Sequence, residues 1–291
     1  MGFALRRGVL LLVITGALSA CTAPGVTLPF TEPAAAVVDG HNISMKAYQA
    51  RLEVSRHRDP FAGTPEVVPS PASPQRLQSF TIEQLVREEI VRQEAEKRGI
   101  MVDDRAVDSR ISTLKARAGA TSFTAALQRN GFTTDSFRAY QRALLTEVAL
   151  LHAMGKDRVD SAARELKAGD AFSSVAARWS DDSGTATRGG DVGWLRPEEI
   201  PESMLAAAVQ SLAAGSMTGI VSTNRGFTIA TVVERRTDQV HLAVVLVLAP
   251  TVDLFSPQGT PAWFVKFIDD REAALQRAGK IELKVGNHAG G

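Results

Sequence analysis

The stretch that decides the fold runs Trp179-Ser-Asp-Asp182 and, after a short gap, Arg188-Gly-Gly-Asp-Val-Gly-Trp-Leu195. A glycine pair stands before an acidic residue and an apolar run of strand length, and Leu166-Lys-Ala-Gly-Asp-Ala-Phe172 comes shortly before it. Glycine supplies the backbone conformations that tight turns and bulges need. The stretch is therefore predicted to be an ordered series of caps, turns and a strand at the centre of a folded domain.

Four motifs in this region resemble the parvulin family of peptidyl-prolyl isomerases. Domains of that family carry a helix reading L-K-x-G-x-x-F, a loop reading F/Y/W-S-x-C/D, a strand reading G-G-D-L-G-W-F, and a closing segment reading G-x-x-S-x-P-V and then G-Y-H-I-I. The closing segment here is Gly215-Ser-Met-Thr-Gly-Ile-Val221 and Gly226-Phe-Thr-Ile-Ala-Thr-Val232. All four motifs occur in the family's order and spacing. The resemblance implies an antiparallel sheet domain of the FKBP-like superfold over residues 155–249.

The composition of the chain limits its partners and cofactors. Its 291 residues, 44% of them apolar, can bury at least one large core, and we expect two modest domains. A formal charge of +1 gives no reason to expect nucleic acid as a partner. The sequence has no phosphate-binding glycine loop, no H-x-x-x-H or cysteine cluster for a metal, and no G-x-S-x-G elbow. We therefore expect no metal and no cofactor.

The N-terminus has the pattern of a bacterial lipoprotein signal. Arg6-Arg7 precedes an apolar run over residues 8–17 that is too short to be interpreted first as a membrane span. Leu18-Ser-Ala-Cys21 holds the only cysteine and resembles the lipobox, which implies lipidation of Cys21 after removal of residues 1–20. The mature protein is then expected outside the cytoplasm, attached to a bacterial membrane by acyl chains. The alternative is an ordinary secretory signal with a chance cysteine.

The next part of the chain is predicted to be a tether followed by a small strand and a helix. Residues 21–33 contain three prolines and no sustained hydrophobic period, which is typical of a linker. Ala34-Ala-Ala-Val-Val-Asp-Gly40 indicates a short strand and a turn, and Ser44 suits the N-cap of a helix. Residues 59–74 hold five prolines, which no helix interior tolerates, so an exposed loop is expected there.

Helices follow this loop, and their order resembles a known chaperone domain. Apolar stripes at helical spacing, such as Ile82, Val86 and Ile90, predict a core-facing side on each helix. The succession over residues 34–154 resembles the N-terminal chaperone domain of SurA/PrsA-type extracytoplasmic foldases. In that family a C-terminal segment returns to the chaperone domain. The resemblance implies that residues 260–291 supply a helix and a strand, with 281–285 pairing with 35–38. The fold class is then α+β, a discontinuous helical domain with the parvulin-like domain inserted.

The parvulin-like region lacks the strand with which family members begin. Those members open with R-H-I-L-V, whose histidine faces the active site, but here a helix from Asp157 follows the previous helix directly. A sheet without a central strand would leave backbone groups unpaired. Residues 240–248 form an apolar run of strand length after a short polar turn, which predicts a hairpin. Our hypothesis is that this run fills the vacant position, with Val244 in place of the first family histidine; the alternative assigns it to the chaperone core.

The parvulin resemblance implies six site positions. The substrate-binding residues are three pocket positions and the histidine replacement: Leu195, Ile200, Met204 and Val244. The catalytic positions are Asp182, at the Cys/Asp position, and Thr228, where the family has the histidine of G-Y-H-I-I. Asp182 is alternatively a loop acid that caps a backbone amide. With both family histidines replaced, slow catalysis is expected.

These patterns together predict a lipid-anchored extracytoplasmic foldase. Its expected partners are unfolded or proline-containing secreted polypeptides, and its expected reaction is cis-trans isomerisation of X-Pro bonds, which meet a rotation barrier of about 18–20 kcal/mol. An apolar pocket that grips the proline ring and excludes water can lower this barrier. The rival interpretations are a non-catalytic holdase with a degenerate parvulin domain and a structural lipoprotein that keeps both domains.

Overall fold

The computed structural model describes residues 32–57, 73–256 and 259–285. The predicted signal sequence 1–20 and the predicted lipidation site Cys21 lie outside these residues. So do nearly all of the predicted tether and nearly all of the proline-rich stretch. In the described parts of the chain, no helix combines the length and the apolarity needed to cross a membrane.

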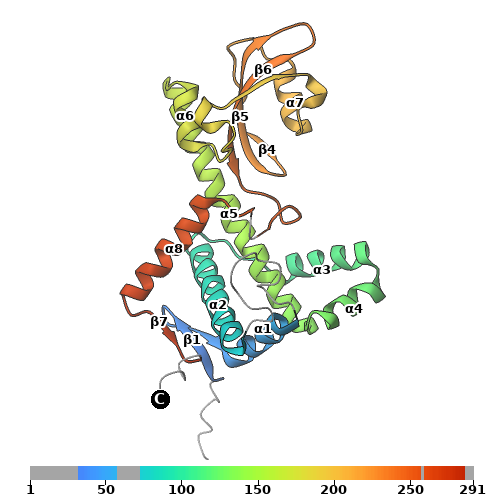
Figure 1. The fold of residues 1–291 in the computed structure, drawn as a ribbon, viewed down its shortest axis with the longest axis vertical. Coiled ribbons are helices and arrows are strands. Elements are labelled where there is room, and N and C mark those ends of the chain that lie inside the picture. Colours follow the sequence, from blue (N-terminus) through green and yellow to red (C-terminus); the bar gives the residue numbers. More distant parts are fainter. Residues whose placement is uncertain (1–31, 58–72, 257–258, 286–291) are drawn as a thin grey trace, which may run out of the picture. The chain divides into compact units, whose positions relative to one another are not determined.

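Helices dominate the first half of the described chain (Figure 1). They are α1 (Met45–His57), α2 (Pro74–Lys97), α3 (Asp104–Ala118), α4 (Ala120–Arg129) and α5 (Thr134–Ala168). The sequence starts and stops them by ordinary capping: Ser73 accepts a hydrogen bond from the Arg76 amide at the start of α2, and Thr133 and Ser136 form a capping box on α5. Gly169, with a φ of 100°, ends α5 in the left-handed conformation that glycine adopts at low cost.

Strands from both ends of the described chain build a three-stranded antiparallel sheet. Its order is β2 (His41–Ser44), β1 (Ala34–Val38), β7 (Ile281–Leu283). Ala36 lies opposite Leu283, and Val38 lies opposite Ile281. The expected pairing of the C-terminal segment with the first strand is therefore present. The helix before β7, α8 (Ala262–Arg277), packs against α2. The helical domain is thus discontinuous in sequence.

A four-stranded antiparallel sheet lies within the inserted part of the chain. Its order is β3 (Asp191–Leu195), β6 (Val240–Leu248), β5 (Gly226–Arg235) and β4 (Val221–Thr223). The predicted hairpin is β5 and β6, in which Ala230 lies opposite Val244. The run that was expected to fill a vacant strand position therefore pairs within this sheet, between β3 and β5.

Side chains of β5 and β6 alternate between the two faces of this sheet, as the two-residue period of a strand requires. On one face Phe227, Ile229, Val245 and Val247 join a core that includes residues of α5 and α6 (Phe172–Trp179). On the other face Ala230, Val232, Leu242 and Val244 pack with α7 (Ser203–Gln210). Figure 1 shows α6 and α7 on opposite sides of the sheet. The face under α7 carries the candidate site.

Helix α5 contacts other helices and also two strands of the four-stranded sheet, because it is long enough to reach them. It has 35 residues and contacts α2 and α3 as well as α6, β5 and β6. A Cβ atom at Gly155 would lie 2.9 Å from the Cβ of Ala249, so glycine permits the close approach of α5 to the end of β6. Glycine inside a helix is unfavourable by about 1 kcal/mol relative to alanine. Close packing against the sheet compensates for that cost.

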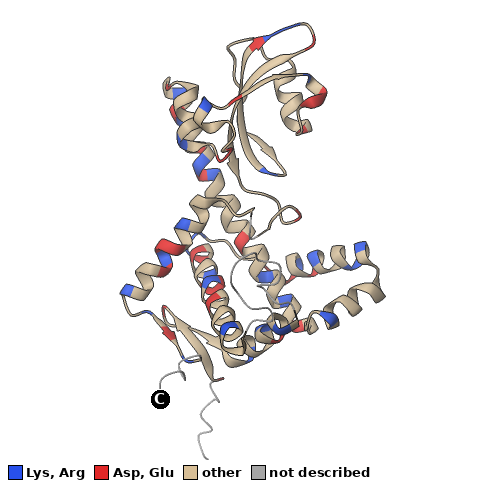
Figure 2. Cartoon of the chain, in the orientation of Figure 1, with Lys and Arg blue, Asp and Glu red and all other residues tan. Residues whose placement is uncertain are grey.

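Charged side chains of both signs alternate along the helices. Figure 2 shows lysines and arginines interspersed with aspartates and glutamates along α2 and α8. Many of them pair across elements, as Arg271 of α8 does with Glu94 of α2 at 2.7 Å. Along α2 and α8, lysines and arginines therefore lie close to acidic residues that offset their charge.

Candidate functional site

A pocket of about 140 Å³ opens on the face of the four-stranded sheet that α7 covers. It is bounded by the end of β3, the segment after the short helix η2 (Pro197–Glu199), α7, and strands β5 and β6. Its lining consists of Asp182, Val192, Leu195, Ile200, Pro201, Glu202, Leu205, Thr223, Arg225, Thr228, Leu242, Val244 and Leu246. Five of the six predicted site residues thus lie around one space.

The wall of the pocket is mostly aliphatic. Ile200, Leu205 and Val244 are each less than a tenth exposed, and they belong to one hydrophobic cluster with Leu242. Leu195 is partly exposed and packs against the same cluster. Alternation places Leu242, Val244 and Leu246 of β6 on this face together. Such a wall excludes water and suits a small apolar ring.

Met204 does not line the pocket, so its predicted place there is wrong. Its side chain is 64% exposed, whereas that of its neighbour Leu205 is 7% exposed and lies in the lining. Consecutive residues on a helix point about 100° apart, so a shift of one position turns a side chain from the pocket to solvent. The motif located the helix but missed its register by one residue.

Asp182 lies in the lining, but hydrogen bonds within its own loop occupy both carboxylate oxygens. Oδ1 accepts a hydrogen bond from the Gly184 amide at 3.2 Å, and Oδ2 accepts one from the Thr185 hydroxyl at 2.7 Å. These bonds match the alternative prediction for Asp182, an acidic loop residue that caps a backbone amide. Asp182 therefore shapes the pocket through its loop as well as bordering it.

Thr228 supplies a polar group at the floor of the pocket. Its side chain is 4% exposed and lies on the same face of β5 as Ala230. Thr228 lines the pocket, and among the described residues no hydrogen bond joins its hydroxyl to another residue. The hydroxyl is thus available to a ligand in the pocket.

Gly190 determines how the glycine-rich stretch meets β6. Its φ is +82°, and a Cβ atom there would lie 2.3 Å from the Val244 carbonyl oxygen. Its own carbonyl accepts a hydrogen bond of 2.8 Å from the Val244 amide. The first glycine pair in the sequence is therefore needed to bring the chain across the strand that carries Val244.

The rim of the pocket contains two charged residues, Arg225 and Glu202, that no sequence motif predicted. Arg225 lies in the turn between β4 and β5, and Glu202 lies just before α7. Both are lining residues. Arg225 could have been predicted at the rim from the sequence, because it lies in the hairpin turn next to the strand that carries Thr228. Turn residues at the end of a strand lie beside the first side chains of that strand.

The loop before the pocket is fixed to β6 and to two other elements by Asp181. Its carboxylate accepts hydrogen bonds from the Leu248 amide at 2.8 Å and from Trp263 Nε1 of α8 at 2.9 Å. The guanidinium of Arg158 of α5 lies 4.7 Å from the Trp263 ring and 5.3 Å from the Trp179 ring. Burial raises the pKa of Asp181, and these hydrogen bonds oppose that shift.

Histidines and metal ligands do not form this site. His241 pairs with Asp191 at 2.7 Å, and His152 packs on the Phe227 ring at a centroid distance of 4.7 Å. Neither lines the pocket. Within residues 32–57, 73–256 and 259–285, no group of three or more histidine, cysteine or acidic side chains is placed to hold a metal ion. The pocket is thus an aliphatic cavity with one buried hydroxyl and a charged rim.

Comparisons with known families match both halves of the chain. The family model for the SurA-like N-terminal domain matches residues 5–151, and that for the PPIC-type PPIASE domain matches residues 151–234. The two matches meet in the middle of α5.

Curated relatives and solved structures carry names of the same kind. A chaperone SurA of Chromobacterium violaceum is 24% identical over 80% of this chain and 64% of the relative. A foldase protein PrsA of Geobacillus kaustophilus is 27% identical over 46% of this chain and 56% of the relative. The solved structures include PrsA from Bacillus subtilis, at 19% identity and a TM-score of 0.23 over 69% of this chain and 80% of that one. They also include a SurA-like chaperone structure from Campylobacter jejuni, at 12% identity and a TM-score of 0.28 over 86% and 97%.

The chain spans less than two thirds of the length of these curated relatives. The match to the SurA-like N-terminal domain covers half of the chain, and the isomerase-domain match continues from its last residue. The chain belongs to the family of proteins with a SurA-like N-terminal domain, and it is of the SurA/PrsA type that also carries a PPIC-type isomerase domain.

Proposed function

We propose that the protein is an extracytoplasmic foldase that binds unfolded polypeptides and catalyses slow cis-trans isomerisation of their X-Pro bonds. The observation that carries this proposal is the aliphatic pocket on the α7 side of the sheet, in which Leu195, Ile200, Leu205 and Val244 surround a space of about 140 Å³. The family matches support the same assignment.

The chemistry needs only a suitable cavity and one polar group. Rotation about the X-Pro bond breaks amide resonance, and the barrier is about 18–20 kcal/mol. A pocket that excludes water favours the less polar twisted amide over the planar one, and so binds the transition state better than the substrate. In the twisted amide the prolyl nitrogen regains its lone pair. The Thr228 hydroxyl, which has no described partner, is the group we assign to donate a hydrogen bond to that nitrogen.

Slow catalysis is part of this proposal. Thr228 and Val244 stand where the family motif has histidines, and no histidine among the described residues lines the pocket. A neutral hydrogen bond contributes only about 0.5–1.5 kcal/mol. For Asp182 we propose that its main role is to hold its loop.

The same lack of imidazole favours a second candidate, a holdase that binds prolyl segments without isomerising them. Both candidates use the same pocket and the same clients. They differ only in whether the bound amide reaches its twisted form faster than in water.

A proline-isomerisation assay on the mature protein separates these candidates. Leu195→Asp places a charge in the aliphatic wall, and we expect at least a tenfold loss of kcat/KM, since burying an unpaired charge is costly. Met204→Asp is the matched control, because Met204 is exposed, and we expect less than a twofold change. Leu195→Ala is a second wall variant, which adds no charge. Urea unfolding of Leu195→Asp and Leu195→Ala shows whether a loss of activity comes from a loss of folded protein. Suppression of client aggregation without any acceleration by the parent protein would establish the holdase instead.

We also propose the domain boundaries and the membrane anchor expected from the sequence. The domains are a chaperone domain of residues 34–154 completed by 260–291, and a parvulin-like domain of residues 155–249 whose first strand is supplied by 240–248. Pairing of β7 with β1 and of β6 with β3 and β5 supports this division. The anchor is the acylated Cys21, at the surface of a bacterial membrane. Fractionation of cells that make the parent or the Cys21→Ser variant tests this anchor. Recovery of both proteins in the same soluble fraction would contradict the anchor.

A further inference from the structure

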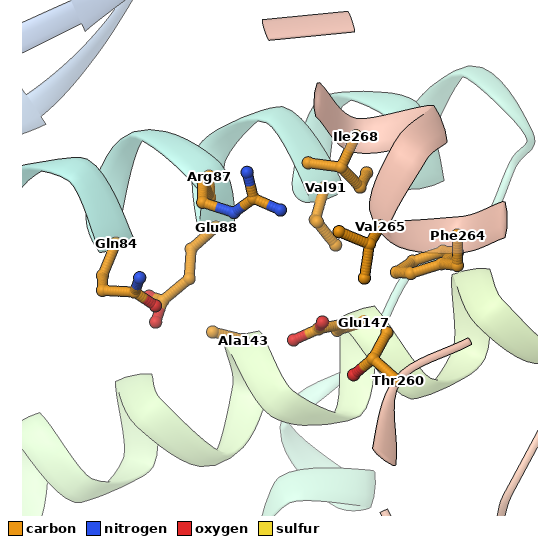
Figure 3. A pocket seen from close by; sticks show the side chains of 10 residues that line it. All are labelled: Gln84, Arg87, Glu88, Val91, Ala143, Glu147, Thr260, Phe264, Val265 and Ile268. Carbon is orange, nitrogen blue, oxygen red and sulfur yellow. The ribbon is translucent and has the colours of Figure 1, made fainter. Parts of the chain in front are cut away.

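A second pocket, of about 290 Å³, lies between α2, α5 and α8 (Figure 3). Its lining comprises Gln84, Arg87, Glu88, Val91, Ala143, Glu147, Thr260, Phe264, Val265 and Ile268. Three helices thus meet around a space large enough for an amino-acid side chain. None of its lining residues belongs to the isomerase-like pocket.

The distinctive group in this pocket is the Glu147 carboxylate. Figure 3 shows it extending from α5 into the space between the helices. No hydrogen bond or ion pair joins it to another side chain in the described parts of the chain. Burial raises the pKa of Glu147 to about 7, Glu88 acts in the same direction, and Arg87 opposes the shift. A partly buried carboxylate without a partner is unfavourable, and a bound cation would reduce that cost.

The other charged groups of the lining are already paired. Glu88 of α2 accepts two hydrogen bonds from the Arg51 guanidinium of α1, at 2.5 and 3.0 Å. Arg87 of α2 donates to Asp269 of α8 at 2.6 Å and to Glu272 of α8 at 3.3 Å.

The excess of acidic side chains around the pocket favours a cationic ligand. The two arginines face Glu88, Asp269, Glu272 and Glu147, so the cluster has more negative than positive side chains when all are ionised. Glu147 is the one member of this cluster that has no partner among the described residues. A positive ligand group would balance it, whereas an anion would add to the excess.

The remaining lining suits an aliphatic stem that ends in an ammonium group. Val91 of α2 and Phe264, Val265 and Ile268 of α8 form an apolar side of the pocket. Gln84 and Thr260 contribute neutral oxygen atoms to the lining. A lysine side chain buries its methylene groups against apolar surface while its three N–H donors seek oxygen acceptors.

We propose that this pocket binds a lysine side chain of a polypeptide client, with the ammonium group at Glu147 and the methylene stem along Val91 and the α8 residues. The identification of the ligand as a polypeptide client rests on the proposed foldase function. The preference for an ammonium on an aliphatic stem rests on the pocket alone.

Binding is expected to depend on pH in a way set by Glu147. The charged groups that face it are Arg87 and Glu88 of α2, with Arg51 of α1 and Asp269 and Glu272 of α8 behind them. Only the ionised carboxylate attracts an ammonium strongly. A lysine ligand should therefore bind more tightly at pH 8 than at pH 5.5 and release a proton from Glu147 where it is still protonated.

The test uses two unstructured, capped peptides that contain no proline and differ only in one residue, lysine or norleucine. Norleucine keeps the four-carbon stem without the ammonium. Titration of the mature protein by NMR at pH 8 is expected to show at least tenfold tighter binding of the lysine peptide, with shifts at residues of α2, α5 and α8.

Two glutamine variants distinguish local recognition from general attraction. Glu147→Gln should abolish the preference for lysine over norleucine and leave isomerase activity unchanged. Glu83→Gln, at an exposed position of α2 outside the pocket, removes the same charge and should keep the preference.

Equal affinity for the two peptides, or an equal loss of preference in both variants, would overturn the proposal. These outcomes are independent of the isomerase assay. Lysine discrimination without isomerisation would refute only the enzyme, and isomerisation without discrimination would refute only this site.

Discussion

At the scale of single residues, Glu147 is a partly buried carboxylate whose pKa is shifted upward by its surroundings. It lies between three helices, and the pKa of its carboxyl is raised to about 7, first by burial and then by Glu88. A raised carboxyl pKa means that the folded state holds a proton that the unfolded state has released. The free energy of unfolding must therefore fall as the pH rises through this range.

Replacement of Glu147 by glutamine should remove this dependence. The ordinary value of 4.5 and the raised value of about 7 bound the pH window, so the unfolding free energy of Glu147→Gln should match that of the parent below pH 4.5. It should exceed that of the parent progressively as the pH rises toward and past 7, and by a constant amount at higher pH, on the order of 3 kcal/mol. Urea unfolding of both proteins from pH 4 to pH 8 measures this difference. A difference that is already full at pH 4.5 would contradict the assignment.

The candidate isomerase site shows which residues a sequence motif can locate. Leu195, Ile200 and Val244 line the pocket, at positions that the family motifs and the replaced strand predict. The motif assigned Met204 to the pocket, whereas the next residue, Leu205, lines it. The motif spacing does not determine at which residue α7 begins, and so it does not determine which side chains of α7 face the pocket. Glu147 was not found at all, since its environment depends on α8, which lies more than a hundred residues away in the chain.

At the scale of elements, the entry into β3 depends on two glycines that differ in what surrounds them. Gly190 and Gly193 both have positive φ, at +82° and +89°. A Cβ atom at Gly190 would collide with the Val244 carbonyl oxygen at 2.3 Å, whereas one at Gly193 would meet nothing within 4 Å. The first glycine is required by space as well as by backbone conformation, and the second by conformation alone.

Alanine substitutions should separate these two requirements. Gly193→Ala should lower the free energy of unfolding by about 1–2 kcal/mol, because alanine is strained in the left-handed backbone conformation. Gly190→Ala must also displace the backbone of β6, so we expect a loss greater by at least about 2 kcal/mol. Urea unfolding gives both values on the same scale. Equal losses would show that β6 yields easily at this point.

The sequence predicted most elements for reasons that operate locally. The Thr133 cap of α5 is an example, because it depends only on residues in the first turn of that helix. The start of α2 at Pro74 differs from the predicted loop over residues 59–74, because proline is tolerated in the first turn of a helix. The position of β6 in the sheet follows from a different consideration, because a missing strand would leave backbone groups of its neighbours unpaired. The edge position of β3 had no such signal, because strand order depends on contacts between segments far apart in the chain.

At the scale of the whole chain, Asp181 connects the loop beside the isomerase-like pocket to the returning helix α8. Its carboxylate accepts hydrogen bonds from the Leu248 amide and from Trp263 Nε1, and its own amide donates to the Leu246 carbonyl at 2.6 Å. Leu246 lines the pocket. The C-terminal helix thus contributes to the position of a pocket wall.

Removal of the indole donor should loosen this connection. Trp263→Phe keeps an aromatic ring but leaves the buried Asp181 carboxylate with one hydrogen bond fewer, and we expect a loss of about 1.5–3 kcal/mol in unfolding free energy. Amide hydrogen exchange at residues 180–182 and 248 should accelerate. Trp194→Phe is the matched control, because no described residue accepts a hydrogen bond from the Trp194 ring nitrogen. Equal effects of the two substitutions would show that the Asp181 bond contributes nothing.

The pairing of β1 with β7 also sets an order of events during biosynthesis. The ribosome makes Val38 long before its partner Ile281. One edge of β1, the middle strand of the three-stranded sheet, therefore stays unpaired while more than two hundred residues are added. The intervening hairpin of β5 and β6 has its partners much closer in the chain and can form first. A nascent chain stalled before residue 281 should therefore carry a formed four-stranded sheet next to an unfinished one, and limited proteolysis of such stalled chains would detect the difference.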